Sequence, residues 1–109
     1  MNFANEVKQK LKGYSEKTII ITHHAKEQAI VRSISLLQIK ENLLNPAHLL
    51  FAGKQISKSE EEEKYDCYFI YDDLKAHRYV IVVNHCCFVC TVMHITTNWK
   101  EVVKKYERM

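Results

Sequence analysis

The stretch from Tyr65 to Ile95 constrains the fold more than any other part of the chain. It holds three short runs rich in β-branched and aromatic residues, which suit the pleated, half-buried surface of a β-sheet. Short polar segments separate these runs and predict turns between consecutive strands. The predicted strands are 65–71, 78–83 and 87–95, and the predicted turns are 72–77 and 84–86. We therefore expect a sheet that the rest of the chain covers.

The segments outside this stretch predict helices, one short strand and one longer strand. Apolar residues that recur every three or four positions predict amphipathic helices, whereas a short β-branched run predicts a strand. In chain order we expect a helix over 3–12, a strand over 18–21, helices over 23–32 and 35–44, a strand over 48–56, and a helix from residue 98 onward. Helices followed by consecutive strands indicate an α+β fold.

We expect a single domain, 1–109, because the chain is long enough for one core. Its N-terminal helices should pack on a mostly antiparallel sheet of four to five strands, with the C-terminal amphipathic helix also lying on the sheet. The second and third long strands are apolar on both faces, so they should be central. Phe69 and Trp99 should lie in the core, and the leucines and Ile39 of 35–44 should form a broad apolar stripe.

Local signals mark the expected ends of these elements. Thr22 and Ser35 suit N-caps, because their hydroxyls accept a hydrogen bond from the first helical turn. Gln38 stands where a capping box places a return bond to Ser35. Gly13 suits a left-handed C-cap, and Gly53 marks a bulge or turn in the first long strand.

The composition fits a chain without a membrane anchor. The net charge of +3 is too small to indicate nucleic-acid binding by itself. No apolar run approaches the roughly 20 residues that a membrane helix needs, and no signal peptide is visible at the N-terminus. We therefore expect a cytoplasmic protein whose four cysteines stay reduced.

A cluster of cysteines and histidines lies in and before the third strand. Cys87 and Cys90 have zinc-ligand spacing, with His85, Cys86 and His94 nearby. Within a strand, however, side chains three positions apart point to opposite faces. Buried free cysteines also pack as small hydrophobic residues. We expect no metal and no other cofactor, and a Cys/His metal-binding module is an alternative.

His24 and Arg78 are the candidate catalytic residues. His24 lies in the first turn of an expected helix, where the helix dipole favours a neutral imidazole that can act as a general base. Arg78 begins an expected strand, a rigid position from which a guanidinium can bind phosphate. Each also has a structural interpretation. His24 can satisfy a local backbone group, and Arg78 can be solvated or paired with Asp72 or Asp73.

Three further residues are candidates for RNA contacts. Arg32 and His77 are the other basic groups close to structured elements, and Tyr79 can stack on a nucleobase. Packing in the core or on the sheet is the commoner role of such a tyrosine. The chain has no Gly-rich phosphate loop, nucleophile elbow or HExxH motif. This argues against nucleotide hydrolysis, the hydrolase fold and the common metalloproteases.

Short motifs follow one another through the middle of the chain. They are Thr22-His23-His24-Ala25, Arg32-x-Ile34-Ser35 and Asn45-Pro46, with Cys90-Thr91-Val92 in the last hairpin. Together they resemble the pattern of small uncharacterised domains grouped with the RelE/ParE-like toxin superfamily. The resemblance spans 18–95 and implies a strand, two helices and an antiparallel sheet.

The resemblance also implies an activity, ribosome-dependent mRNA cleavage by several basic and polar residues. Two departures from the pattern stand out. Gln28 replaces an arginine, which removes a charge that could face RNA, and Ser33 replaces a glycine. The positions carried over from the family pattern are His24, Arg32, Arg78 and Thr91, the last in a structural role.

The leading hypothesis is a RelE-like toxin-type protein acting on RNA, an mRNA endoribonuclease of a toxin–antitoxin pair. A ribose 2′-OH would attack the adjacent phosphate, with His24 assisting proton transfer and Arg78 and Arg32 neutralising the developing charge. His24 and Arg78 would have to meet at one end of the sheet, beside a helix N-terminus. The expected partners are RNA or the ribosome and a small acidic antitoxin, and no membrane. The alternative is a non-catalytic interaction domain that uses a sheet edge or groove.

Overall fold

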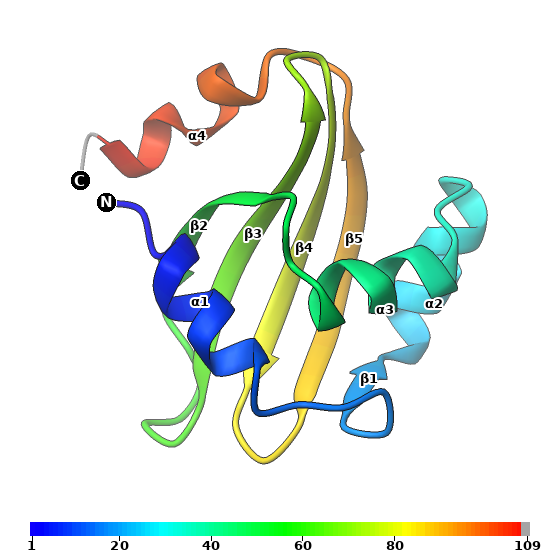
Figure 1. Cartoon of the computed structure of the whole chain (residues 1–109), viewed down its shortest axis with the longest axis vertical. Helices are drawn as coiled ribbons and strands as arrows, with labels where there is room; N and C mark the ends of the chain where they lie inside the picture. The colour runs from blue at the N-terminus through cyan, green and yellow to red at the C-terminus, as the bar shows by residue number, and fades with distance from the viewer. Residues whose placement is uncertain (108–109) are drawn as a thin grey trace.

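The computed structural model describes residues 1–107, in which four helices pack against a five-stranded sheet (Figure 1). The helices are α1 (Ala4–Leu11), α2 (His23–Val31), α3 (Leu36–Leu44) and α4 (Trp99–Glu107). The strands are β1 (Ile19–Ile21), β2 (Leu49–Gln55), β3 (Glu63–Asp72), β4 (Lys75–Val83) and β5 (Cys87–Ile95). The elements follow the order expected from the sequence, so the α+β class is confirmed.

The sheet is mostly antiparallel and has the strand order β1-β5-β4-β3-β2. Strands β2 to β5 pair with their neighbours along the chain in antiparallel register, which forms one meander. The short strand β1 adds to the far side of β5 in parallel. Strands β3 and β4 lie inside the sheet and away from its edges, as their apolar residues on both faces predict.

The turn between β3 and β4 is shorter than the sequence suggested. β3 continues to Asp72 and β4 begins at Lys75, while Asp72 Oδ1 accepts the N–H of Leu74 at 2.9 Å. The prediction of a turn over 72–77 is therefore wrong. Strand alternation gives the reason, because Ala76 and His77 are both buried, one on each face of the sheet. Arg78 consequently lies within β4 and not at its start.

The N-terminal helices lie on one face and one edge of the sheet, with α1 and α3 over the face and α2 beside β5 (Figure 1). Alternate residues of the strands point to this face and meet the helices in the larger of two cores. Phe69 is fully buried there, as predicted. This core includes Val7, Leu11, Ala25, Ala29, Ile39 and Leu43 from the helices and Tyr65, Phe69, Tyr79, Ile81, Val89 and Val92 from the strands.

Of the described helices, only α4 packs on the opposite face, near the β3–β4 turn (Figure 1). Its apolar stripe meets strand residues in a smaller second core. Trp99 is half-buried at the margin of this core, whereas Val103 is almost fully buried. None of the helices in residues 1–107 has the length and apolar character to cross a bilayer. The second core contains Phe51, Tyr68, Ile70, Ala76, Ile95 and Val103.

The helix starts agree with the cap signals in part. Thr22 and Ser35 accept backbone N–H groups in the first turns of α2 and α3, at 3.2 and 3.3 Å. The Gln38 amide does not return to Ser35, however, and donates instead to the Tyr71 hydroxyl at 3.0 Å. The capping-box expectation is therefore right for one of its two bonds, because the sheet offers Gln38 a competing acceptor.

Helix ends differ more from expectation. The end of α2 is left-handed at Ser33, whose φ is 54°. The Ile34 N–H reaches back to the Ala29 carbonyl at 2.8 Å, the long bond of a Schellman motif. Gly13, in contrast, has no positive φ, and α1 ends at Lys12 in ordinary helical geometry. The predicted left-handed cap at Gly13 is therefore wrong.

The apolar stripe on α3 is narrower than predicted. Ile39 and Leu43 are buried in the larger core, but Leu36, Leu37 and Leu44 are 37%, 67% and 43% exposed. A nine-residue helix at the rim of the sheet has too little neighbouring structure to cover every leucine. Exposed leucines therefore remain on the outer side of α3.

Candidate functional site

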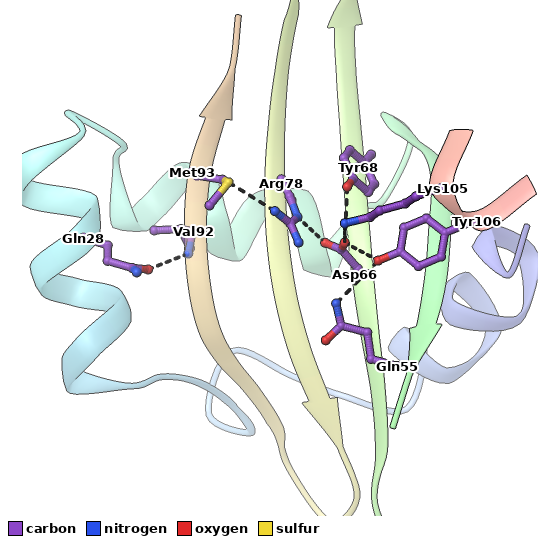
Figure 2. Close-up of polar contacts among 9 residues, drawn as sticks. All are labelled: Gln28, Gln55, Asp66, Tyr68, Arg78, Val92, Met93, Lys105 and Tyr106. Atoms are coloured by element: carbon purple, nitrogen blue, oxygen red, sulfur yellow. Dashed lines mark hydrogen bonds and ion pairs between the residues drawn. The ribbon is translucent and has the colours of Figure 1, made fainter. Parts of the chain in front are cut away.

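Asp66 on β3 and Arg78 on β4 form an ion pair on the α4 side of the sheet (Figure 2). Asp66 faces Val80 and Arg78 faces Tyr68 in the strand register, so the charged residues are diagonal neighbours on one face. Arg78 Nε donates to Asp66 Oδ1 at 2.5 Å. The Asp66 side chain is fully buried, whereas 20% of the Arg78 side chain is exposed. The pair therefore presents a cationic group to solvent.

The second carboxylate oxygen of Asp66 is held by two tyrosines (Figure 2). The Tyr68 and Tyr106 hydroxyls donate to Oδ2 at 3.2 and 2.5 Å, and Lys105 Nζ lies 4.0 Å away. Burial, and then the hydrogen bond to Asp66, raises the pKa of Tyr106 to about 12. Burial and the nearby Asp66 charge also raise the pKa of Tyr68. Both phenols thus keep their protons at neutral pH and act as donors to the buried carboxylate.

The Arg78 guanidinium is fixed in orientation yet keeps donors available. Burial lowers the pKa of Arg78, but the hydrogen bond and charge of Asp66 outweigh burial, so this pKa lies above its ordinary value. Nη1 donates to Met93 Sδ at 3.5 Å, and the guanidinium carbon lies 5.8 Å from the centroid of the Tyr68 ring. Within residues 1–107, Nη2 makes no hydrogen bond. A planar guanidinium held in this way can bind an oxyanion.

Gly53 makes room for the tyrosine that α4 contributes. Gly53 pairs with Asp66 in regular register on β2, and a Cβ at this position would lie 2.5 Å from Cζ of Tyr106. The Tyr106 ring therefore reaches Asp66 only because residue 53 has no side chain. The predicted bulge or turn at Gly53 is wrong, since the irregularity in β2 lies between Leu49 and Phe51.

A cavity of 430 Å³ opens on the same face, farther along the sheet from α4. We call it the sheet cavity. Arg78 and Val82 are four positions apart on β4 and share a face, so the cavity begins about 13 Å from Arg78. The residues that line it include Lys58, Glu62, Lys64, Val82, Phe88 and Cys90.

His24 on α2 and Arg32 at its C-cap lie at the exposed edge of β5 beyond β1. They line one small cavity of 210 Å³ with Glu27, Gln28 and Val31. The helix pairs with this strand edge through its side chains. The Gln28 amide oxygen accepts the Val92 N–H at 2.9 Å, and Arg32 Nη1 donates to the Val92 carbonyl at 2.6 Å (Figure 2 shows the Gln28 bond).

Gln28 and Arg32 thus satisfy the backbone of an edge strand, as a further β-strand would. The Gln28 amide nitrogen lies 3.0 Å from Nε2 of His24, and the Arg32 carbonyl lies 2.7 Å from Nε2 of His94. Gln28 therefore has structural partners on the strand edge and on its own helix. Arg32 is half-buried, and the hydrogen bond to the strand uses one nitrogen of its guanidinium, Nη1.

His77 and Tyr79 lie on the helix side of the sheet, in a buried hydrogen-bond network. His77 Nδ1 is 2.8 Å from the Tyr79 hydroxyl, which also accepts from Asn42 at 2.9 Å. Burial, with a contribution from nearby His94, lowers the pKa of His77 to about 4. The imidazole is therefore neutral at pH 7 and shares a hydrogen bond with the tyrosine hydroxyl. Side-chain exposure is 3% for His77 and 0% for Tyr79, so neither ring reaches the surface.

The structure brings together some of the predicted site residues and separates others. His24 shares a cavity with Arg32, and His77 shares a hydrogen bond with Tyr79. Arg78 points to the opposite face, towards Asp66 and α4 (Figure 2). The expected meeting of His24 and Arg78 therefore does not occur.

Asp66 and Tyr106 were not among the site residues expected from the sequence. One signal was present, because a carboxylate at the second position of the otherwise apolar and aromatic run 65–71 needs a partner if it is buried. Strand alternation would then have pointed to Arg78 on the next strand. No local signal identifies Tyr106, since its contact depends on how α4 packs.

The cysteines are separated as strand alternation predicts. Cys87 is buried in the larger core, whereas Cys90 lines the sheet cavity on the other face. Burial raises the pKa of both thiols, that of Cys87 to about 12. Among residues 1–107, no three side chains of the His, Cys, Asp or Glu type gather into a metal-binding group.

Comparison with protein-family models, curated proteins and solved structures finds no match to this chain. The fold and site define an α+β protein with a buried Asp66–Arg78 pair on a partly uncovered sheet face. Its function has to be argued from the chemistry of that face.

Proposed function

We propose that this is a RelE-like toxin-type protein that binds single-stranded RNA on the part of the sheet that α4 leaves uncovered. The observation that carries the proposal is the Arg78 guanidinium. Asp66 fixes its Nε side from within the sheet, and Nη2 has no partner within residues 1–107. Because its orientation is already fixed, a phosphate can form charge-assisted hydrogen bonds with little additional ordering.

The sheet cavity supplies contacts that suit the rest of an RNA strand. Phe88 offers an aromatic surface for base stacking, and Lys58 and Lys64 add positive charge. Glu62 at the same cavity favours the exposed edge of a base over a second phosphate. Arg78 and the cavity share one face of β4, so a short extended RNA segment can contact both.

The resemblance to RelE/ParE-like toxins supports RNA as the ligand and mRNA cleavage as the outcome. The order of a short strand, two helices and an antiparallel meander agrees with what that resemblance implies. In the proposal Arg78 binds phosphate and neutralises developing charge. His24 lies on α2 beside the β5 edge, outside this RNA path, so we assign it no proton transfer.

Fluorescence anisotropy with a labelled single-stranded RNA tests the proposal. The variant D66N/R78Q removes both charges and keeps a hydrogen-bonding group at each position, so we expect it to fold. We expect it to weaken binding about tenfold or more, as loss of a charged phosphate contact does. The control K12A removes one exposed positive charge from the far side of the sheet and should have a small effect.

Equal affinity of D66N/R78Q and the wild type would overturn the assignment of Arg78. In cells, induced expression should slow growth and cut translated mRNA, and D66N/R78Q should relieve both effects. H24A should retain full RNA affinity. Harmless expression combined with no RNA binding, with or without ribosomes, would overturn the toxin-type proposal.

A further inference from the structure

A cavity of 460 Å³ lies on the helix side of the sheet, between α3 and the end of β3. We call it the α3 cavity, and its volume is in the range of small-molecule sites. Gln38, Glu41 and Asn42 line it from α3, His48 from the segment before β2, and Tyr71 from β3. Of the residues that the structure describes, no lysine or arginine lines it. Glu41 therefore makes this cavity acidic in a chain whose net charge is +3.

Asn42 has one end of its side-chain amide without a partner. Its Nδ2 donates to the Tyr71 and Tyr79 hydroxyls at 2.7 and 2.9 Å, which uses both of its protons. Within residues 1–107 its Oδ1 accepts no hydrogen bond, although only 6% of the residue is exposed. No fully enclosed side-chain nitrogen or oxygen in these residues lacks a partner, so Oδ1 has to reach the cavity. An acceptor in this position needs a donor from a bound molecule or from solvent.

The Tyr71 hydroxyl has the opposite property, a proton without an acceptor. It accepts from Gln38 Nε2 at 3.0 Å and from Asn42, which uses both of its lone pairs. Its own proton points elsewhere, and no acceptor for it lies within residues 1–107. Gln38 Oε1 and the exposed Glu41 carboxylate are further open acceptors, and in the same part of the chain Glu41 forms no ion pair. The α3 cavity thus presents a hydroxyl donor beside several acceptors, one of them charged.

From these observations we infer that the α3 cavity binds a small amino sugar, in which an ammonium group stands next to a hydroxyl. The ammonium donates to Asn42 Oδ1 and to the Glu41 carboxylate. The sugar hydroxyl accepts from Tyr71 and donates to Gln38 Oε1. The rings of His48 and Tyr71, whose centroids lie 4.8 Å apart, offer apolar surface to the C–H groups of the sugar ring. RNA fits this cavity less well, because Glu41 would repel its phosphates.

This inference does not rest on the RNA proposal. Asn42 bonds to Tyr79 on the helix side of the sheet, whereas Arg78 points to the opposite face. The probe is glucosamine, added at millimolar concentration to ¹⁵N-labelled protein and followed by NMR. Glucose replaces the ammonium by a hydroxyl, and cyclohexylamine keeps an ammonium on a six-membered ring without hydroxyls. The variants are Y71F, E41Q and the control E60Q, which removes an exposed charge outside the cavity.

We expect glucosamine to shift the amide signals of Asn42 and Tyr71 and to bind about fivefold more tightly than glucose or cyclohexylamine. E41Q should weaken glucosamine binding about fivefold and leave glucose binding unchanged, while E60Q changes neither. Y71F should remove the preference for glucosamine over cyclohexylamine, because the sugar hydroxyl loses its donor. Equal affinity for glucosamine and either control ligand would overturn the inference. So would wild-type affinity of E41Q for glucosamine, or the absence of shifts at the cavity.

Discussion

At the scale of single residues, Asp66 shows how a charged group is kept inside the sheet. Its carboxylate has no exposed surface, and Arg78, Tyr68 and Tyr106 occupy its two oxygens. Removing it leaves a guanidinium and two hydroxyls without their acceptor. A buried charge or hydroxyl without a partner destabilises the fold by more than the intact ion pair stabilises it. Asp66 therefore supports the fold as well as orienting Arg78.

We predict that D66A lowers the free energy of unfolding by about 3–5 kcal/mol, because it leaves a half-buried cation unpaired. D66A/R78M, which removes both charges, should recover part of this loss. Urea denaturation followed by circular dichroism measures both. A D66A protein within about 1 kcal/mol of the wild type would show that the pair contributes little to the fold.

The buried His77 should make the free energy of unfolding depend on pH. Its pKa is about 4 in the folded protein and about 6.5 when unfolded. Between these values the unfolded chain binds a proton that the folded protein does not. The neutral His77 therefore makes its full contribution to the free energy of unfolding above pH 6.5. This contribution is lost as pH falls towards 4, by up to about 3 kcal/mol.

H77Q removes this titration and keeps an acceptor for Tyr79. The free energy of unfolding of the wild type minus that of H77Q should therefore decrease as pH falls from 7 to 4. Glu63, whose pKa is lowered to about 2 by its bonds to Lys10, Lys54 and Tyr65, contributes equally to both proteins and cancels in the difference. A difference that is independent of pH would contradict a neutral, buried His77.

Ser33 is a strained position at the end of α2. Its φ of 54° suits glycine. S33G should stabilise the protein by about 1 kcal/mol, because it removes the steric cost of a left-handed side chain. Thermal denaturation measures this, and S33A should be no more stable than wild type. An S33G protein that melts below wild type would show that the serine side chain offsets the strain.

At the scale of elements, α4 is attached to the sheet by its apolar stripe and by Tyr106 near its end. Tyr106 passes over Gly53 to reach Asp66, and its ring packs against Phe51. The N-terminal ammonium of Met1 also donates to the Tyr106 carbonyl at 3.3 Å. Besides its apolar contacts, the helix therefore has one hydrogen-bonded side chain that a single methyl group on β2 can displace.

We predict that G53A displaces the Tyr106 ring and costs about 1–3 kcal/mol. Hydrogen exchange of the α4 amides should accelerate, while that of α1 and α3 changes little. In a Y106A background the same substitution should cost much less, since the obstructing ring is absent. Equal costs in the two backgrounds would contradict the contact between Gly53 and Tyr106.

Most elements could be predicted from the sequence because periodicity reflects burial directly. The strands follow from runs rich in β-branched and aromatic residues, and the starts of α2 and α3 follow from Thr22 and Ser35. The site could not be predicted as well. Alternation separates His77 and Tyr79 from Arg78, but it does not show which face the helices cover. The contact of Tyr106 with Asp66 depends on packing between distant segments, so no local pattern identifies it.

At the scale of the whole molecule, the sheet separates structural and proposed functional surfaces. The helix side holds the larger core and the buried His77 network. The other side is covered by α4 at one end and carries Arg78 and the sheet cavity beyond it. A cavity of 520 Å³ lies at a third location, beside β1.

The central claim is that RNA contacts Arg78 and the uncovered sheet face. The most direct test is NMR titration of ¹⁵N-labelled protein with single-stranded oligouridine, observing the Arg78 Nε–H and the backbone amides together. We predict that the largest shifts occur at Arg78, Lys64, Val82 and Phe88, while those of α2 and β1 remain small. Shifts concentrated at His24 and Arg32 on α2, or no shifts at all, would contradict the account.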